Sequence, residues 1–151
     1  MKVKEIMKKE VVSLKPEDNA MKAAALLFKM EISGLPVIDA AGNLVGMFTE
    51  KEVLGRLLPS YIEKVGKFIY EESPKSIQKK IQELSNMQVQ QLMRREVVTT
   101  SEDATLCEVA RIILTQKARR LPVLDKNSKV TGIIARCDIL KAMIEESDPQ
   151  K

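Results

Sequence analysis

The sequence predicts a mixed α/β (α+β) fold built from two similar units, each in the order strand, helix, strand, strand, helix. The 151-residue chain is 44% hydrophobic, and a chain of this length buries roughly two thirds of the surface that it exposes when unfolded. Sliding the sequence by 86 positions aligns residues 3–58 with 89–144 without a gap, and 12 of the 56 pairs are identical. Each aligned half contains short apolar runs of strand length beside stretches with apolar residues at helical spacing.

The first repeat begins with the β-rich run Glu10–Leu14 and continues with the helical pattern Ala20–Met30. The turn Pro16–Asn19 supplies a candidate helix cap, because its polar side chains can accept hydrogen bonds from the first helical amides. Two strands and a closing helix complete the repeat: Leu35–Ile38, Leu44–Thr49 and about Glu50–Leu58.

The second repeat follows the same order. Its first helix is expected to be capped by Ser101, with Glu102 and Asp103 as carboxylates of the first turn. The expected elements are Val97–Thr100, Thr105–Gln116, Leu121–Leu124, Val130–Ile134 and Arg136–Glu145.

An insertion at about Pro59–Met87 separates the repeats and has no counterpart in either. Ser60–Tyr70 and Pro74–Ser85 both carry apolar residues at helical spacing, so two helices are expected. They form either a hairpin packed on the module or a surface for a dimer or another partner. The expected organisation is therefore a first unit at 1–58, a helical insertion at 59–88, a second unit at 89–147 and a tail at 148–151.

Composition excludes several functions. The chain has no histidine, which excludes nucleophile–histidine pairs and histidine metal sites. Cys107 and Cys137 lack metal-ligand or redox spacing and are expected to be small buried hydrophobes in a reducing cytoplasm. No apolar run is long enough to span a membrane. The net charge of +4 comes from scattered basic doublets, which favours a solvated surface over nucleic-acid binding.

The order of motifs in both repeats resembles a tandem CBS-domain pair, or Bateman module. The motifs are MKKEVVS, ISGLPVID and GNLVGMFTEKEVL in the first repeat, and MRREVVTT, ARRLPVLD and KVTGIIARCDIL in the second. The resemblance covers about three quarters of the chain. It implies two units packed sheet to sheet about a pseudo-twofold axis, clefts between them for adenosine-containing ligands, and a flat homodimer.

The resemblance also implies two sets of ligand-binding residues, each using a carboxylate in the first turn of a helix for the ribose hydroxyls. The first set is Thr49 and Glu52 with Thr99, Thr100, Ala118, Arg119, Arg120 and Leu121. The second set is Asp138 and Arg136 with Val12, Ser13, Ile32, Ser33, Gly34, Leu35 and Pro36.

Both sets depart from the family pattern. Glu52 stands where the family prefers Asp, and Ala135 stands where it has a hydroxyl residue. We therefore expect the Thr49 cleft to favour a polyphosphate and the Asp138 cleft to favour a ligand with less phosphate. The alternative interpretation is that Thr49, Glu52 and Asp138 only cap and stabilise their helices.

The sequence thus predicts a non-catalytic, cytoplasmic regulatory module whose effector is AMP, ADP, ATP or S-adenosylmethionine. It requires no cofactor, and its expected partners are a second copy of itself and an unidentified effector protein. A ligand-independent adaptor for a protein or a nucleic acid is the alternative. An enzyme is not expected, because no phosphate-binding loop, nucleophile elbow or obvious carboxylate pair is present.

Overall fold

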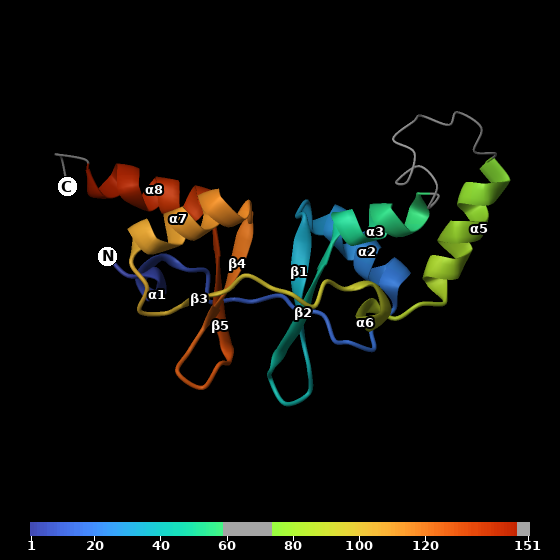
Figure 1. Cartoon of the computed structure of the whole chain (residues 1–151), viewed down its shortest axis with the longest axis horizontal. Helices are drawn as coiled ribbons and strands as arrows, with labels where there is room; N and C mark the ends of the chain where they lie inside the picture. Colours follow the sequence, from blue (N-terminus) through green and yellow to red (C-terminus); the bar gives the residue numbers. More distant parts are fainter. Residues whose placement is uncertain (59–73, 148–151) are drawn as a thin grey trace. The chain divides into compact units, whose positions relative to one another are not determined.

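The computed structural model describes residues 1–58 and 74–147 (Figure 1). These residues form two compact units that interleave along the chain. Unit 1 comprises Met1–Val12, Ala41–Leu44 and Val97–Lys151, and unit 2 comprises Ser13–Ala40 and Val45–Glu96. Each unit therefore combines most of one repeat with a short segment from the other.

Unit 2 contains a two-stranded sheet flanked by helices. Its core buries Leu27, Val37, Phe48, Leu84 and Val89, so α5 of the insertion and the short α6 both contribute to it. The elements are α2 (Ala20–Met30), β1 (Gly34–Ile38), β2 (Leu44–Thr49), α3 (Glu50–Leu57), α5 (Pro74–Ser85) and α6 (Val89–Leu92).

Unit 1 contains a three-stranded sheet in the order β3-β4-β5, in which β3 is parallel and β5 antiparallel to β4. Its core includes Val3, Val109, Leu121, Val123 and Ile134. The elements are α1 (Val3–Ile6), β3 (Thr100–Ser101), α7 (Leu106–Gln116), β4 (Arg120–Leu124), β5 (Val130–Ala135) and α8 (Arg136–Glu146).

A segment from the other repeat is bonded to the second strand of each hairpin. In unit 1, Lys8 and Ile133 exchange two backbone hydrogen bonds of 2.9 Å. In unit 2, Met47 and Arg94 exchange equivalent bonds of 2.9 and 2.8 Å. The preceding helices, α1 and α6, place fully buried valines in the respective cores.

A glycine beside each of these backbone pairs makes room for the incoming segment. A Cβ atom at Gly46 would lie 2.6 Å from the Met93 sulfur and 2.8 Å from the Arg94 carbonyl oxygen. At the repeat-related Gly132, a Cβ atom would meet the Met7 side chain, with the Lys8 carbonyl oxygen at 3.1 Å. The two glycines recur at the offset of 86 because both hairpins accept a crossing segment at this point.

The predicted elements agree with the structure in most places. The bounds of α2 and α5 are confirmed, and the mixed fold class is as predicted. The strand predicted at Glu10–Leu14 is wrong: only Leu14 forms a bridge, to Val37. The helix predicted at Ser60–Tyr70 lies outside the described residues.

The prediction of buried cysteines is wrong, since Cys107 and Cys137 are both exposed. Cys107 directly follows the buried Leu106 on α7, and a helix turns each residue about 100° from its neighbour. Cys137 lies in the first turn of α8, whose buried residues are Ile139 and Ala142. Both thiols therefore lie on the outer faces of their helices.

The predicted cap of the second repeat is also wrong. Helix α7 begins at Leu106, and its cap is Thr105, whose hydroxyl accepts a 3.2 Å hydrogen bond from the Glu108 amide. The cap predicted near Asn19 is confirmed, because the Asn19 side chain accepts a bond from the Lys22 amide.

We expect Gly46→Ala to destabilise the protein more than Gly132→Ala. The first adds a Cβ atom against a carbonyl oxygen that is held in place, whereas the second mainly meets the flexible Met7 side chain. Overpacking of this kind costs about 1–3 kcal/mol. Urea denaturation measures the difference, with Gly55→Ala as the control, since a Cβ atom there meets nothing within 4 Å. Equal losses at Gly46 and Gly132 would contradict this account.

Candidate ligand-binding site

The two ribose-binding carboxylates predicted from the sequence hold the same position in the two units. Glu52 is the third residue of α3, and its Oε2 accepts a 3.1 Å hydrogen bond from the Thr49 amide. Asp138 is the third residue of α8, and its Oδ2 accepts a 2.9 Å bond from the Ala135 amide. The first amides of a helix lack partners within the helix, so such carboxylates stabilise its start.

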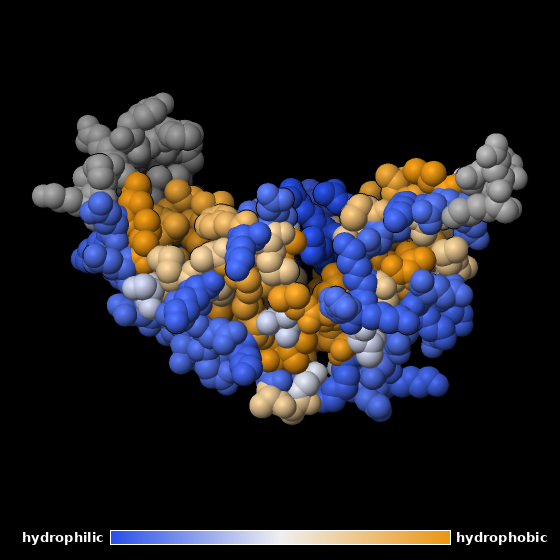
Figure 2. Space-filling view, turned by 180° about the vertical axis from the view of Figure 1, so that it is seen from behind, coloured by the Kyte–Doolittle hydropathy of each residue, from blue (hydrophilic) through white to orange (hydrophobic). Residues whose placement is uncertain are grey.

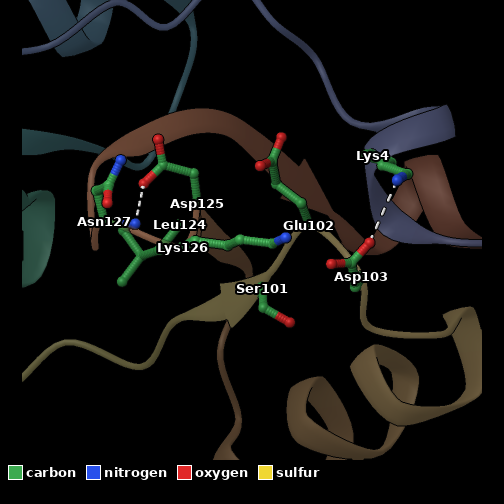
Figure 3. Close-up of a pocket in the computed structure, with 8 residues that line it drawn as sticks. All are labelled: Lys4, Ser101, Glu102, Asp103, Leu124, Asp125, Lys126 and Asn127. Carbon is green, nitrogen blue, oxygen red and sulfur yellow. Dashed lines mark hydrogen bonds and ion pairs between the residues drawn. The ribbon is translucent and has the colours of Figure 1, made fainter.

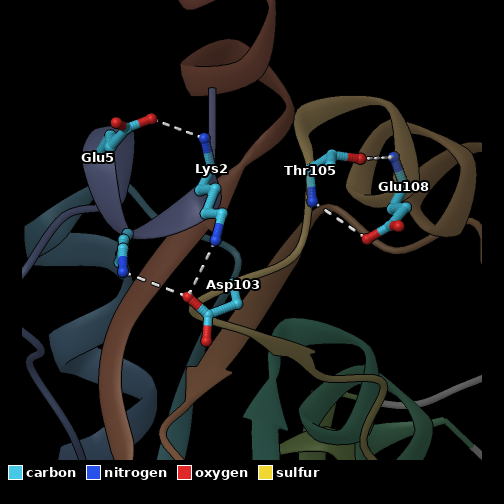
Figure 4. Close-up of polar contacts among 6 residues, drawn as sticks. Lys2, Glu5, Asp103, Thr105 and Glu108 are labelled. Atoms are coloured by element: carbon cyan, nitrogen blue, oxygen red, sulfur yellow. Dashed lines mark hydrogen bonds and ion pairs between the residues drawn. The ribbon is translucent and has the colours of Figure 1, made fainter.

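Other helices of the chain begin in the same way. Glu5 accepts from the Lys2 amide at 2.7 Å, and Glu108 accepts from the Thr105 amide at 3.1 Å (Figure 4). This geometry is therefore a general feature of helix starts in this protein. Glu52 and Asp138 therefore do contact the starts of their helices, whereas the Thr49 hydroxyl makes no cap hydrogen bond. Whether capping is their only role stays open, and a ligand-binding function must be compatible with it.

The start of each helix lies beside the start of a strand in the same unit. The Glu50 amide donates to the Ser33 carbonyl oxygen at 2.9 Å, and the Arg136 amide donates to the Arg119 carbonyl oxygen at 3.4 Å. These two bonds are related by the 86-residue offset. They hold the first turn of α3 or α8 against the residues that precede a Leu-Pro-Val strand.

In unit 2 the structure brings Thr49 and Glu52 next to Ser33 and Gly34. The Thr49 hydroxyl donates to Glu52 Oε2, the same oxygen that accepts from the Thr49 amide. A Cβ atom at Gly34 would lie 2.7 Å from Thr49 Cγ2. Glycine at position 34 therefore leaves space for the threonine side chain.

In unit 1 Ala135 takes the place of Thr49, and Arg120 pairs with it across the sheet. The Asp138 side chain is only 14% exposed. Its Oδ1 lies 4.0 Å from the Lys8 ammonium group, which comes from the segment bonded to β5. Lys8 is missing from the sequence prediction because no local motif connects residue 8 with residue 138.

The remaining predicted residues differ in how they can contact a ligand. Several are buried in their units, so their side chains are not on the surface; these are Gly34, Leu35, Pro36, Thr100 and Leu121. Others are half-buried: Ile32, Ser33, Thr99, Ala118 and Arg120. The exposed ones are Val12, Ser13, Arg119 and Arg136.

The groupings seen within each unit differ from the two predicted sets. Ser33 and Gly34, which the resemblance assigns to the Asp138 cleft, lie beside Thr49 in unit 2. Arg119 and Arg120, assigned to the Thr49 cleft, lie beside the start of α8 in unit 1. The cleft assignments that combine residues of both repeats stay predictions.

Two surface hollows lie elsewhere, and neither is lined by a predicted ligand-binding residue. The one in unit 1 has a volume of about 540 Å³. In Figure 3, Ser101 is seen at the end of β3, Leu124 to Asn127 at the end of β4, and Lys4 on α1. Asp125 there accepts bonds from the backbone amides of Asn127 and Lys129. The hollow in unit 2 is lined by Asn86, Gln88, Gln90, Gln91, Met93 and Arg95.

Electrostatics at the unit 1 hollow centre on Asp103. The pKa of Asp103 lies below its ordinary value of 3.8. The largest cause is the hydrogen bond from the Lys4 ammonium group, and the positive charges of Lys4 and Lys2 lower the pKa further. The Lys4 bond is 3.2 Å long, and Lys2 lies 3.6 Å away. These ion pairs join the N-terminal segment to the loop before α7. The Asp103 carboxylate is thus already paired with two lysines of the chain.

The described residues contain no group of three or more acidic or cysteine side chains that could hold a metal ion. In the same residues, no helix has the length and apolar character needed to cross a membrane.

The chain belongs to the CBS domain family, whose family model matches residues 3–59 and 89–145. It is 32% identical over 162 aligned residues to the uncharacterized protein MJ1426 of Methanocaldococcus jannaschii, with 95% of this chain and 92% of that protein covered. It is 29% identical to the inosine-5'-monophosphate dehydrogenase of the same organism, but spans only 23% of that enzyme.

The fold is shared with solved CBS-pair structures. CBSX2 in complex with AMP has a TM-score of 0.75 and 28% identity, and the match covers 97% of this chain and 98% of that one. CBSX2 is a CBS-pair protein from Arabidopsis thaliana. The CBS pair of MJ0100, solved with 5-methylthioadenosine and S-adenosyl-L-methionine, matches in fold with a TM-score of 0.68 and 24% identity.

We expect Asp103 to stabilise the folded protein above about pH 4 and to lose this effect in acid. Its pKa is lower in the folded state, so the contribution is present above the unfolded pKa and disappears as the pH falls through the folded one. Asp103→Asn should therefore lower stability at pH 7 more than at pH 3, and Lys4→Gln should do the same. Urea denaturation at both pH values tests this; an equal loss at both would contradict it.

Proposed function

We propose that this protein is a non-catalytic regulatory module that binds an adenosine-containing ligand through Glu52 and Asp138. The carrying observation is the identical placement of the two carboxylates. Each caps its helix through one oxygen, Oε2 or Oδ2, and the second oxygen is directed to neither cap amide. A carboxylate can accept hydrogen bonds from both ribose hydroxyls. The similarity to CBSX2, solved with AMP, supports adenylate as the ligand.

The surroundings of the carboxylates suit a phosphorylated nucleoside. The helix N-termini beside them favour negative charge, because their first amides carry partial positive charge. In unit 2, the Thr49 hydroxyl proton is directed to Glu52, so it must rotate before it can donate to a phosphate oxygen. Of the other residues predicted from the resemblance, Arg119, Arg120 and Arg136 would contact phosphate through their guanidinium groups, and the remainder would frame the base.

The ligand can regulate the conformation of the module if it contacts groups whose relative arrangement differs between two conformations. A ligand shifts a conformational equilibrium only by the difference between its affinities for the two states. Graded changes in adenylate concentration would then give graded changes in the population of the binding state.

We expect Asp138→Ala and Glu52→Ala each to weaken nucleotide binding about tenfold or more, since hydrogen bonds to a charged group contribute about 1.5–3 kcal/mol. Isothermal titration calorimetry with AMP, ADP, ATP and S-adenosylmethionine is the measurement. Glu108→Ala is the matched control, because Glu108 caps α7 with the same geometry but lies outside the predicted site.

Loss of affinity in all three variants would attribute the effect to helix capping and contradict the proposal. Absence of binding by the wild-type protein below millimolar concentrations would contradict it as well. Asp138→Asn refines the result, because an amide oxygen still accepts the Ala135 amide proton but the carboxylate charge is gone.

We further propose that the module forms a homodimer through the outer faces of its helices. Exposed apolar residues recur at the 86-residue offset: Phe28 and Leu114 are 72% and 78% exposed, and Leu54 and Leu140 are 57% and 61% exposed. Hydrophobic side chains are visible on the surface of both units (Figure 2). Large exposed apolar residues that are grouped on a surface favour a protein interface.

We expect Leu140→Glu to shift the protein from dimer to monomer, because a buried carboxylate would lose its hydration at the interface. Light scattering after size-exclusion chromatography measures the molecular mass. The control is Thr115→Glu, which adds the same charge to α7 at an exposed polar residue and should reduce the mass less. A monomeric wild-type protein would contradict the dimer proposal but not the ligand proposal.

A further inference from the structure

We infer that Lys8 sets the charge preference of the ligand at Asp138, so that this carboxylate takes a phosphate-bearing nucleotide in preference to a neutral or cationic adenosyl compound. The inference rests on the proposed function, because it assumes that Asp138 accepts the ribose. It assigns Lys8, which belongs to the MKKEVVS motif but is not among the predicted ligand contacts, as a second ligand contact.

The backbone fixes Lys8 beside the site. Its amide donates to the Ile133 carbonyl oxygen, and its carbonyl oxygen accepts from the Ile133 amide, both at 2.9 Å. Ile133 lies two residues before Ala135, the cap of α8. The base of the lysine side chain is therefore held against β5, and only the ammonium end can move.

The ammonium group lies near the carboxylate oxygen that does not cap the helix. It lies 4.0 Å from Asp138 Oδ1, whereas the Ala135 amide uses the other oxygen, Oδ2. The Lys8 side chain is 65% exposed, so its end is accessible to a ligand. A separation of 4.0 Å is too long for a strong hydrogen bond, and the ammonium group can turn to a phosphate without losing one.

A ribose on Oδ1 would bring its 5′ substituent into the range of this ammonium group. A 5′ phosphate gains a charge-assisted hydrogen bond from it. A sulfonium in the same place would meet a like charge instead, and a neutral thioether would gain nothing. The lysine thus separates anionic ligands from the others.

Unit 2 differs at the corresponding positions. There Glu52 is contacted by the Thr49 hydroxyl, and the first residue of the helix is Glu50. In unit 1 the hydroxyl is absent, and the first residue of α8 is Arg136. Lys8 is therefore a further side chain near the Asp138 carboxylate, on Oδ1 together with the Cys137 thiol at 4.0 Å, and it adds a positive charge. The inference differs from the sequence-based expectation that the Asp138 cleft favours a ligand with less phosphate, and the titrations below distinguish the two.

The test compares AMP, 5′-methylthioadenosine and S-adenosylmethionine by calorimetry in a Glu52→Ala background, so that the heat reports on Asp138. We expect Lys8→Gln to weaken AMP about tenfold, as for the loss of one charge-assisted bond, and to leave methylthioadenosine unchanged. Lys8→Arg should retain the AMP preference. Arg94→Gln is the matched control, because Arg94 has the equivalent backbone pairing in unit 2.

Equal weakening of AMP and methylthioadenosine by Lys8→Gln would overturn the inference, since it would show a merely structural effect. An unchanged AMP affinity, or the same loss in Arg94→Gln, would overturn it too. These outcomes leave the proposed function intact, whereas failure of all three probes to bind the wild-type protein would remove both proposals. Thermal unfolding of each variant confirms that it is folded before titration.

Discussion

The structure depends on the antiparallel backbone pairing that, within each unit, bonds a segment of one repeat to the hairpin of the other repeat. Lys8 pairs with Ile133, and Arg94 pairs with Met47. A side chain at the adjacent strand position crowds each pairing, most severely at Gly46, where a Cβ atom would lie 2.8 Å from the Arg94 carbonyl oxygen. Because α1 and α6 precede these pairs, the same contact closes both cores.

This pairing also determines what lies beside the candidate site. The segment that completes unit 1 brings a lysine to Asp138, and the two helices that begin at the ends of β2 and β5 bring their third residues to equivalent places. Capping and ligand binding are compatible because a carboxylate has two oxygens. One oxygen stabilises the helix start, worth about 0.5–2 kcal/mol for a cap, and the other can accept a ligand hydroxyl. A ligand site of this kind needs no group that titrates near neutral pH, which agrees with a chain that lacks histidine.

Much of the fold could be predicted because the repeat doubles every local signal. The apolar spacing of Ala20–Met30 and the Ser-Pro sequence before the α5 pattern are local signals that predict the positions of both helices. The short helices α1 and α6 could not be predicted, since four residues carry no periodic pattern and form only through tertiary contacts. The strand predicted at Glu10–Leu14 failed for a related reason: β-forming residues need a neighbouring strand, and only Leu14 has one.

The candidate site was predictable in part as well. The carboxylates and Thr49 belong to motifs in which spacing places them at a helix start, and the structure places them there. Lys8 was not predictable, because its contact with Asp138 spans 130 positions and arises from the segment pairing. Exposed cysteines were missed because the tendency of free thiols to be buried does not specify the face of a helix on which they lie.

The central claim is that Asp138 caps α8 and binds a ribose at the same time. A crystal structure of the protein grown with AMP tests it most directly. We expect ribose hydroxyls within hydrogen-bond distance of Asp138 Oδ1, with the bond from the Ala135 amide to Oδ2 retained. A nucleotide bound away from both Asp138 and Glu52, for example in the hollow lined by Ser101 and Asp125, would contradict it.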